Sequence, residues 1–139
     1  MQMSDEMTNF FGENIHIYTR AQALEDGVLV DVSETAREAG FKIPVAVTRA
    51  VWDQYIKWTN EDTNKQTNQD EAGRLWDVMW MLMCAIKMRH SEADQLIYEL
   101  YVVSRDGKGR TPKCIKLKSS IGGGDKREPV LTIMLPTED

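Results

Sequence analysis

The densest group of basic side chains lies between residues 105 and 118. This segment carries six Lys and Arg against one Asp, a local net charge of +5. Such a patch attracts phosphate groups or acidic protein surfaces at long range. Lysines on the solvent side of a strand also protect a sheet edge against aggregation, and that structural explanation is the more common one. The six residues are Arg105, Lys108, Arg110, Lys113, Lys116 and Lys118.

A second group of residues could line a nucleotide site. Tyr18 and Arg20 end a short alternating segment, Trp52 lies in an aromatic helical stretch, and Glu128 precedes a later strand. This layout is distantly similar to ADP-ribosyltransferase-like domains, in which a polar residue grips a dinucleotide, an aromatic ring stacks on nicotinamide and a Glu orients the acceptor. No diagnostic motif of that superfamily is present. Surface and capping roles explain the same residues, because the segment after Tyr18 matches the S/T-x-x-E/Q capping box.

Methionine and tryptophan gather in residues 75–86, where eleven of twelve residues are apolar. Thioethers adapt to varied partners, so this segment could dock another protein. A surface helix does not carry apolar side chains all round, however, so we predict a buried central helix. Asp77 is the exception within it. A buried carboxylate needs a partner, and Arg74 is the nearest cation on the same helix face.

Other catalytic signatures are missing from the sequence. The run Gly122–Asp125 lacks the P-loop spacing and precedes a strand, so we predict a flexible turn there. His16 and His90 have no zinc-ligand spacing. Cys84 and Cys114 form neither a metal motif nor a disulfide framework, which favours a reducing, cytoplasmic compartment. We therefore expect no metal and no cofactor.

Length, composition and net charge limit the classes of partner that this protein is expected to bind. The 139 residues are enough for about one domain, and 42% hydrophobic residues are enough for a core. The net charge of −5 argues against a general duplex-DNA binder, so nucleic acid is expected only at the basic segment. Residues 1–100 carry nine Lys and Arg against 17 Asp and Glu, whereas residues 101–139 carry eight against five. No apolar run reaches the roughly 18 residues that suggest a membrane span, so we expect no membrane partner.

The order of periodic segments predicts an α+β domain over residues 15–139, after a flexible N-terminus at residues 1–14. N-terminal helices with a short strand come first, then the buried central helix, then a C-terminal antiparallel β-meander. The polar segment 59–71 contains no hydrophobic residue and is predicted to be a loop. Helices are predicted at 19–26, 33–39, 48–58 and 75–86, and strands at 28–32, 96–103, 113–118 and 130–135.

Three motifs carry a family resemblance. They are YTRAQALEDGVLVDV at residues 18–32, EAGRLWDV at 71–78 and EPVLTIMLP at 128–136. They are similar to a family of small bacterial and phage proteins that is catalogued only as a domain of unknown function. Its members are encoded largely on plasmids, integrative elements and prophages. The resemblance implies an accessory gene of a mobile element and brings no established activity.

These observations favour a non-enzymatic protein that binds a host or mobile-element protein. Acidic surfaces can mimic nucleic acid, so the expected target is a nucleic-acid-handling defence complex such as a CRISPR effector or a restriction enzyme. The candidate binding residues are the six basic residues and Trp52. The alternative is an enzyme that uses NAD or another nucleotide through Tyr18, Arg20 and Glu128. Contact between the basic segment and DNA or RNA is a third hypothesis.

Overall fold

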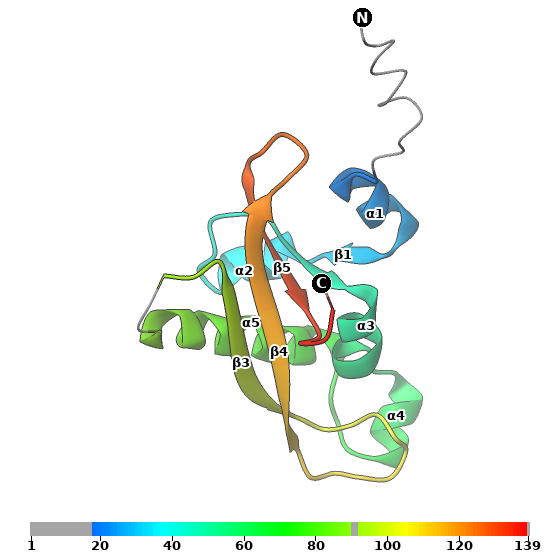
Figure 1. Cartoon of the computed structure of the whole chain (residues 1–139). Helices are drawn as coiled ribbons and strands as arrows, with labels where there is room; N and C mark the ends of the chain where they lie inside the picture. The colour runs from blue at the N-terminus through cyan, green and yellow to red at the C-terminus, as the bar shows by residue number, and fades with distance from the viewer. Residues whose placement is uncertain (1–17, 90–91, 139) are drawn as a thin grey trace, which may run out of the picture.

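A five-stranded mixed sheet forms the centre of the chain (Figure 1). The structure, a computed structural model, describes residues 18–89 and 92–138, so the predicted flexible N-terminus at 1–14 lies outside the described residues. The strand order is β1-β2-β5-β4-β3. The elements are α1 (Arg20–Asp26), β1 (Leu29–Asp31), α2 (Ser33–Glu38), β2 (Val45–Thr48), α3 (Arg49–Val51), η2 (Trp52–Ile56), α4 (Asn60–Lys65), α5 (Glu71–Met88), β3 (Gln95–Val102), β4 (Lys113–Gly123) and β5 (Pro129–Met134).

The sheet confirms the C-terminal meander and adds a strand that the sequence analysis missed. β3, β4 and β5 follow one another in antiparallel pairs, and β5 then pairs in parallel with β2. Residues 45–47 of β2 are buried. A strand covered on both faces shows no apolar–polar alternation, which explains why its short apolar run was not recognised.

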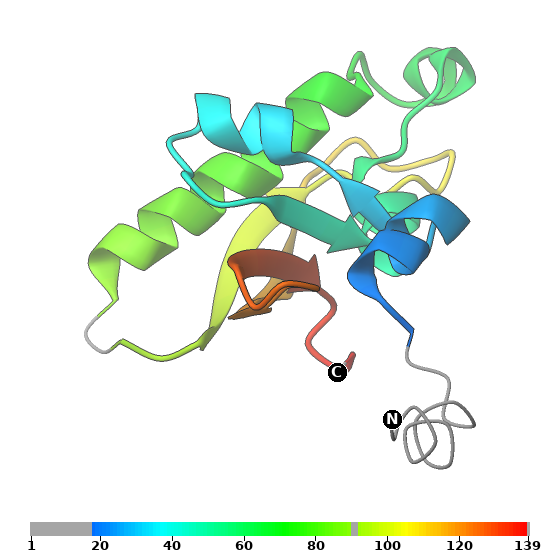
Figure 2. The same cartoon turned by 90° about the horizontal axis from the view of Figure 1, so that it is seen from above.

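Helices α2 and α5 lie together on one face of the sheet (Figure 2). On α5, Leu75, Val78 and Leu82 are buried, and the Tyr98 hydroxyl of β3 donates a 3.1 Å hydrogen bond to the Val78 carbonyl. The predicted helix is therefore confirmed. Its apolar side chains are not buried all round, however, because only one side of α5 contacts the sheet. The exposed large apolar residues on α5 are Trp76, Trp80, Met81 and Met88.

The first helix begins and ends as its sequence predicts. The Thr19 side chain accepts from the Gln22 amide, and the Gln22 side chain accepts from the Thr19 amide, which completes the capping box. Gly27 ends the helix with a φ of 81°, a left-handed conformation that favours glycine. In α2, Ser33 is the first helical residue, and its hydroxyl donates to the Asp31 carboxylate.

The segment 59–71 is not the loop that its polarity predicts. It contains α4, which begins at a capping box between Thr59 and Asp62. Gln66, just after this helix, is only 3% exposed. Its amide nitrogen donates to the Ser104 carbonyl at 2.8 Å, and its amide oxygen accepts from the Gly107 amide at 3.0 Å. A fully bonded polar side chain thus takes the place of an apolar core residue, and it fixes the loop between β3 and β4.

The buried charge of α5 is Arg74 and not Asp77. Arg74 is 5% exposed, and its guanidinium donates to the Ile56 carbonyl at 3.1 Å and to the Val103 carbonyl at 3.0 Å. It also lies over the Trp58 ring, 4.6 Å from the ring centroid. Burial lowers the pKa of Arg74, although the nearby Asp62 opposes this shift. Asp77 lies at the surface, so it does not need the buried partner that the sequence analysis expected.

Replacing Gln66 with Ala tests whether this amide holds the loop. We expect the Gln66→Ala variant to lose about 1–3 kcal/mol of unfolding free energy, because it leaves buried loop groups without partners. Chemical denaturation monitored by tryptophan fluorescence measures the loss. Lys65→Ala is the matched control, since its 3.1 Å pair with Glu61 is exposed and such pairs contribute about 0.3–0.5 kcal/mol. Equal losses in the two variants would contradict the assigned role of Gln66.

Candidate functional site

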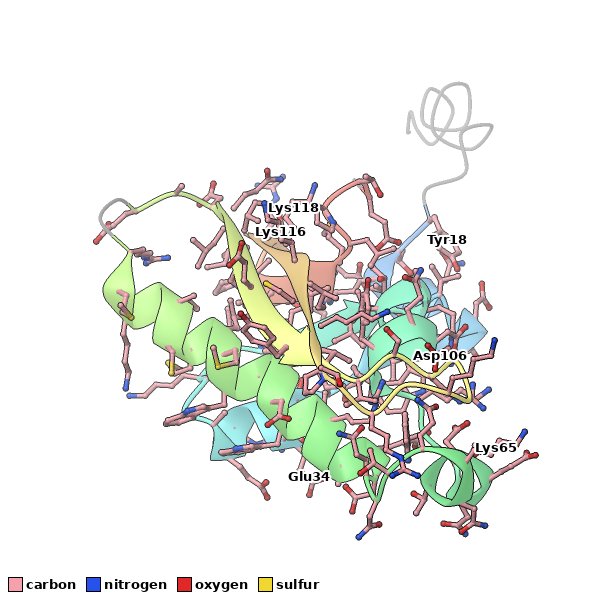
Figure 3. The ribbon with its side chains drawn as sticks, turned by 90° about the horizontal axis from the view of Figure 1, so that it is seen from below. Tyr18, Glu34, Lys65, Asp106, Lys116 and Lys118 are labelled. Carbon is pink, nitrogen blue, oxygen red and sulfur yellow. The ribbon has the colours of Figure 1, made fainter. Side chains whose placement is uncertain are left out.

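Three of the six basic residues, Arg105, Lys108 and Arg110, lie in the loop between β3 and β4, and Lys113 is the first residue of β4. The other two lie on the open face of β4. Lys116 and Lys118 point from the same face of β4, away from the loop that contains Asp106 (Figure 3). Arg105 is already bonded to the Asp62 carboxylate of α4. The Lys118 amine donates to the Glu138 carbonyl at 2.6 Å. Part of the predicted patch therefore has a structural role.

Tyr18, Arg20 and Trp52, which the sequence suggests for a nucleotide site, each contact different residues of the fold. The Tyr18 hydroxyl donates to the Asp26 carboxylate at 2.8 Å, and Trp52 packs against the hydrophobic core. The Arg20 guanidinium donates to the Thr132 hydroxyl at 2.8 Å and to the Leu131 carbonyl at 3.1 Å.

Arg20 and Glu128 do lie in one neighbourhood. Burial lowers the pKa of Arg20, and the carboxylates of Asp31, Asp125 and Glu128 oppose that shift. The structure thus brings Arg20 near Glu128, while it directs Tyr18 toward Asp26 and Trp52 toward the core.

The glycine-rich turn fixes α1 to the sheet. The Asp125 carboxylate accepts from the backbone amides of Arg20 at 2.8 Å and Ala21 at 3.0 Å. Gly124 lies so close to Glu128 that an added Cβ would come 2.5 Å from the Glu128 carboxyl carbon. The carboxylate of Asp125 occupies the amides at the start of α1, so this turn holds two elements together.

Two clefts lie along the seam between α5 and β3, and we call them together the edge furrow. One part is a cleft of about 460 Å³ toward the end of α5, and the other is a cleft of about 150 Å³ near its start. The α5 residues that line both parts are three or four positions apart and form one side of the helix. The residues that line the two parts include Asp77, Met81, Cys84, Met88, Leu96 and Tyr101.

One wall of the edge furrow is a strand edge with unused hydrogen-bonding groups. β3 is the last strand of the sheet, and no other strand within residues 18–89 and 92–138 pairs with its outer edge. The Asp94 carbonyl accepts from the Ile121 amide, which continues the β3–β4 register. In an antiparallel ladder, bonded and non-bonded pairs alternate. Residues 94, 96, 98, 100 and 102 therefore bond toward β4, and residues 95, 97, 99 and 101 turn their N–H and C=O groups outward.

Helix α5 extends beyond this strand edge. Figures 1 and 2 both show its C-terminal part passing the outer side of β3. Met81 and Met88 lie on this part of the helix and are exposed. In the described part of the chain, no strand fills the space below them. The space beside β3 and below the end of α5 therefore fits one further strand of the sheet.

The other exposed side of α5 carries an aromatic pair. The rings of Trp76 and Trp80 stack with centroids 5.8 Å apart and an interplanar angle of 11°. Helical spacing places these two residues away from the stripe that contains Met81 and Met88. We call this pair the Trp ridge. Two distinct apolar surfaces thus flank the sheet-facing side of α5.

Comparison with known proteins identifies the family. A family model described as a family of unknown function, DUF6573, matches residues 7–139. The chain belongs to the DUF6573 family. No curated protein and no solved structure matches this DUF6573 chain. Among its described residues, no group of three or more His, Cys, Asp or Glu can hold a metal ion, and no helix is long and apolar enough to cross a membrane.

Stability at acid pH should report the bond between Asp62 and Arg105. Burial alone would raise the pKa of Asp62, but the bonds from Arg105 and Thr59 hold it below its ordinary value. The carboxylate therefore stabilises the fold above its unfolded pKa of about 4, and this contribution disappears as the pH falls through the lower folded pKa. We expect Asp62→Asn to be less stable than wild type near pH 7, and the difference to narrow in acid. Denaturation between pH 7 and pH 2 measures it.

Glu61→Gln provides the control, because Glu61 is the neighbouring exposed carboxylate. Its difference from wild type should be small at every pH. A difference for Asp62→Asn that stayed constant down to the acid limit would contradict the assigned ion pair.

Proposed function

We propose that this DUF6573 protein is a non-enzymatic accessory protein of a mobile element that binds a protein of the host or of the element. The observation that carries this proposal is the Trp ridge on α5. Trp76 is 36% exposed and Trp80 is 44% exposed, although both are large apolar residues on the surface of a small domain. Tryptophan is among the residues that contribute most to protein interfaces.

The ridge is suited to binding because its two rings already support each other. Each stacked ring restricts the other, so less side-chain freedom is lost when a partner covers them. Met83, which is half-buried and three positions after Trp80, adds adaptable apolar area beside the ridge. This combination favours recognition of a protein surface.

The charge distribution supports a target that handles nucleic acid, such as a CRISPR effector or a restriction complex. Residues 1–100 carry a net charge of −8, which gives the chain an acidic part that can compete for a nucleic-acid-binding surface.

The alternative function is an ADP-ribosyltransferase-like activity at Arg20 and Glu128. Their proximity favours it, whereas the hydrogen bonds of Arg20 to β5 favour a structural role. Incubation with NAD and host lysate, followed by mass spectrometry of the proteins, tests this alternative. Modification that disappears in both Arg20→Ala and Glu128→Ala, with folding intact, would replace the binding proposal with an enzymatic one.

Capture of a partner from host lysate tests the binding proposal. We expect immobilised wild-type protein to retain a stoichiometric protein partner at low and moderate salt. The double variant Trp76→Ala/Trp80→Ala should lose about 90% of it or more, since large losses at hot-spot aromatics are common. Val28→Ala is the control, because Val28 is 51% exposed but lies outside α5. Absence of a stoichiometric partner at either salt concentration would count against the function.

A further inference from the structure

We propose that the edge furrow binds an extended segment of a partner protein, which adds to the sheet as a sixth strand on β3. This inference rests on the proposed protein-binding function and specifies how part of the partner is held. The proposed segment has apolar side chains at alternate positions, and these side chains contact α5. On its opposite face the segment has a Lys or Arg that lies beside Glu99.

The main-chain geometry supplies the first argument. The peptide groups of Ile97, Glu99 and Tyr101 point away from β4, as the bond between Ile121 and Asp94 establishes. An added strand satisfies these groups with its own N–H and C=O groups. Recognition by strand addition derives affinity from such bonds and specificity from pockets for alternate side chains.

The overhang of α5 supplies the second argument. A strand on the outer edge of β3 would lie about 4.8 Å from it, below the last turns of the helix. Its inward side chains would contact Met81, Cys84 and Met88, which line the 460 Å³ cleft. These contacts bury apolar surface that the described chain leaves exposed.

The charge of Glu99 favours a basic residue in the bound segment. Glu99 is the only charged residue of β3, and its side chain lies on the open face, opposite Lys116 of β4. A basic residue placed beside Glu99 on the added strand forms an opposite-charge cross-strand pair. An acidic residue there is repelled.

A second copy of this chain fits the edge less well. In an antiparallel pair of β3 strands, each α5 would extend past its own strand edge into the space beside the other strand, where the other α5 already lies. A pair centred on Glu99 would place two carboxylates opposite each other. A narrow segment without its own helix avoids both conflicts.

The test begins with a display library of random ten-residue peptides selected on the intact protein. We expect enriched peptides to alternate apolar and other residues and to carry Lys or Arg. Fluorescence anisotropy then measures their affinity for wild type, Glu99→Thr and Glu99→Pro. Both variants remove the carboxylate, but only proline removes the outward N–H, and no bond to β4 depends on that group. Circular dichroism and denaturation establish that each variant is folded.

We expect Glu99→Pro to weaken every selected peptide by about tenfold or more, and Glu99→Thr to weaken basic peptides by less than about threefold. Glu99→Thr should also abolish the preference for Lys over Glu in the peptide.

The contacts with α5 are tested separately. Met81→Glu should weaken peptide binding, because Met81 lines the furrow, while Ala72→Glu, on an exposed part of α5, should not. Equal affinities for Glu99→Pro and wild type, or a library without enriched peptides, would overturn the inference.

Two further outcomes separate this inference from the proposed function. If Glu99→Pro still captures the lysate partner and Trp76→Ala/Trp80→Ala does not, strand addition is wrong and the binding function stands. If wild type is a dimer in sedimentation and Glu99→Pro is a monomer, the edge belongs to a second copy and the inference is overturned. Loss of capture in both variants supports both proposals.

Discussion

One buried guanidinium determines how the main helix lies on the sheet. Arg74 joins the carbonyls of Ile56 and Val103 and the Gln69 side chain, and it stacks on Trp58. These groups come from η2, from the end of β3 and from the segment around α4. Hydrogen bonds between a charged donor and buried carbonyls are strong, and losing the donor would leave those carbonyls without a partner. The start of α5 is therefore fixed against the end of β3, and the opposite end of the helix extends past the sheet.

The two edges of the sheet differ in how they are protected. β1 has three residues, and a strand so short offers few free backbone groups. β3 has eight residues, and among them only Glu99 is charged. A long apolar edge is an aggregation risk unless another segment covers it. The furrow beside β3 thus combines the least protected edge of the sheet with the exposed methionines of α5.

Local signals in the sequence predict much of this fold. Thr19 and Gln22 mark α1, and the alternation from Leu96 onward marks the meander, because both patterns depend on near neighbours. Helix α4 has no hydrophobic signal in the sequence, because Asp62 and Gln66 are buried through hydrogen bonds and not through hydrophobicity. Both Arg74 and Asp77 lie on α5, and only the carbonyls of Ile56 and Val103, which are distant in the sequence, make Arg74 the buried charge. The edge position of β3 depends on long-range pairing, which no local pattern encodes.

The proposed mode of binding divides affinity and selectivity between different groups. Main-chain bonds to the outer edge of β3 are independent of the partner's side chains, so they provide affinity for any extended segment. Met81 and Met88 have flexible thioether side chains, which adapt to apolar residues of different shapes. Selectivity must then come from a fixed group, and Glu99 is the charged residue that the strand itself provides. A protein whose targets vary in sequence benefits from this division, because one charge and an alternating pattern are enough to specify a suitable segment.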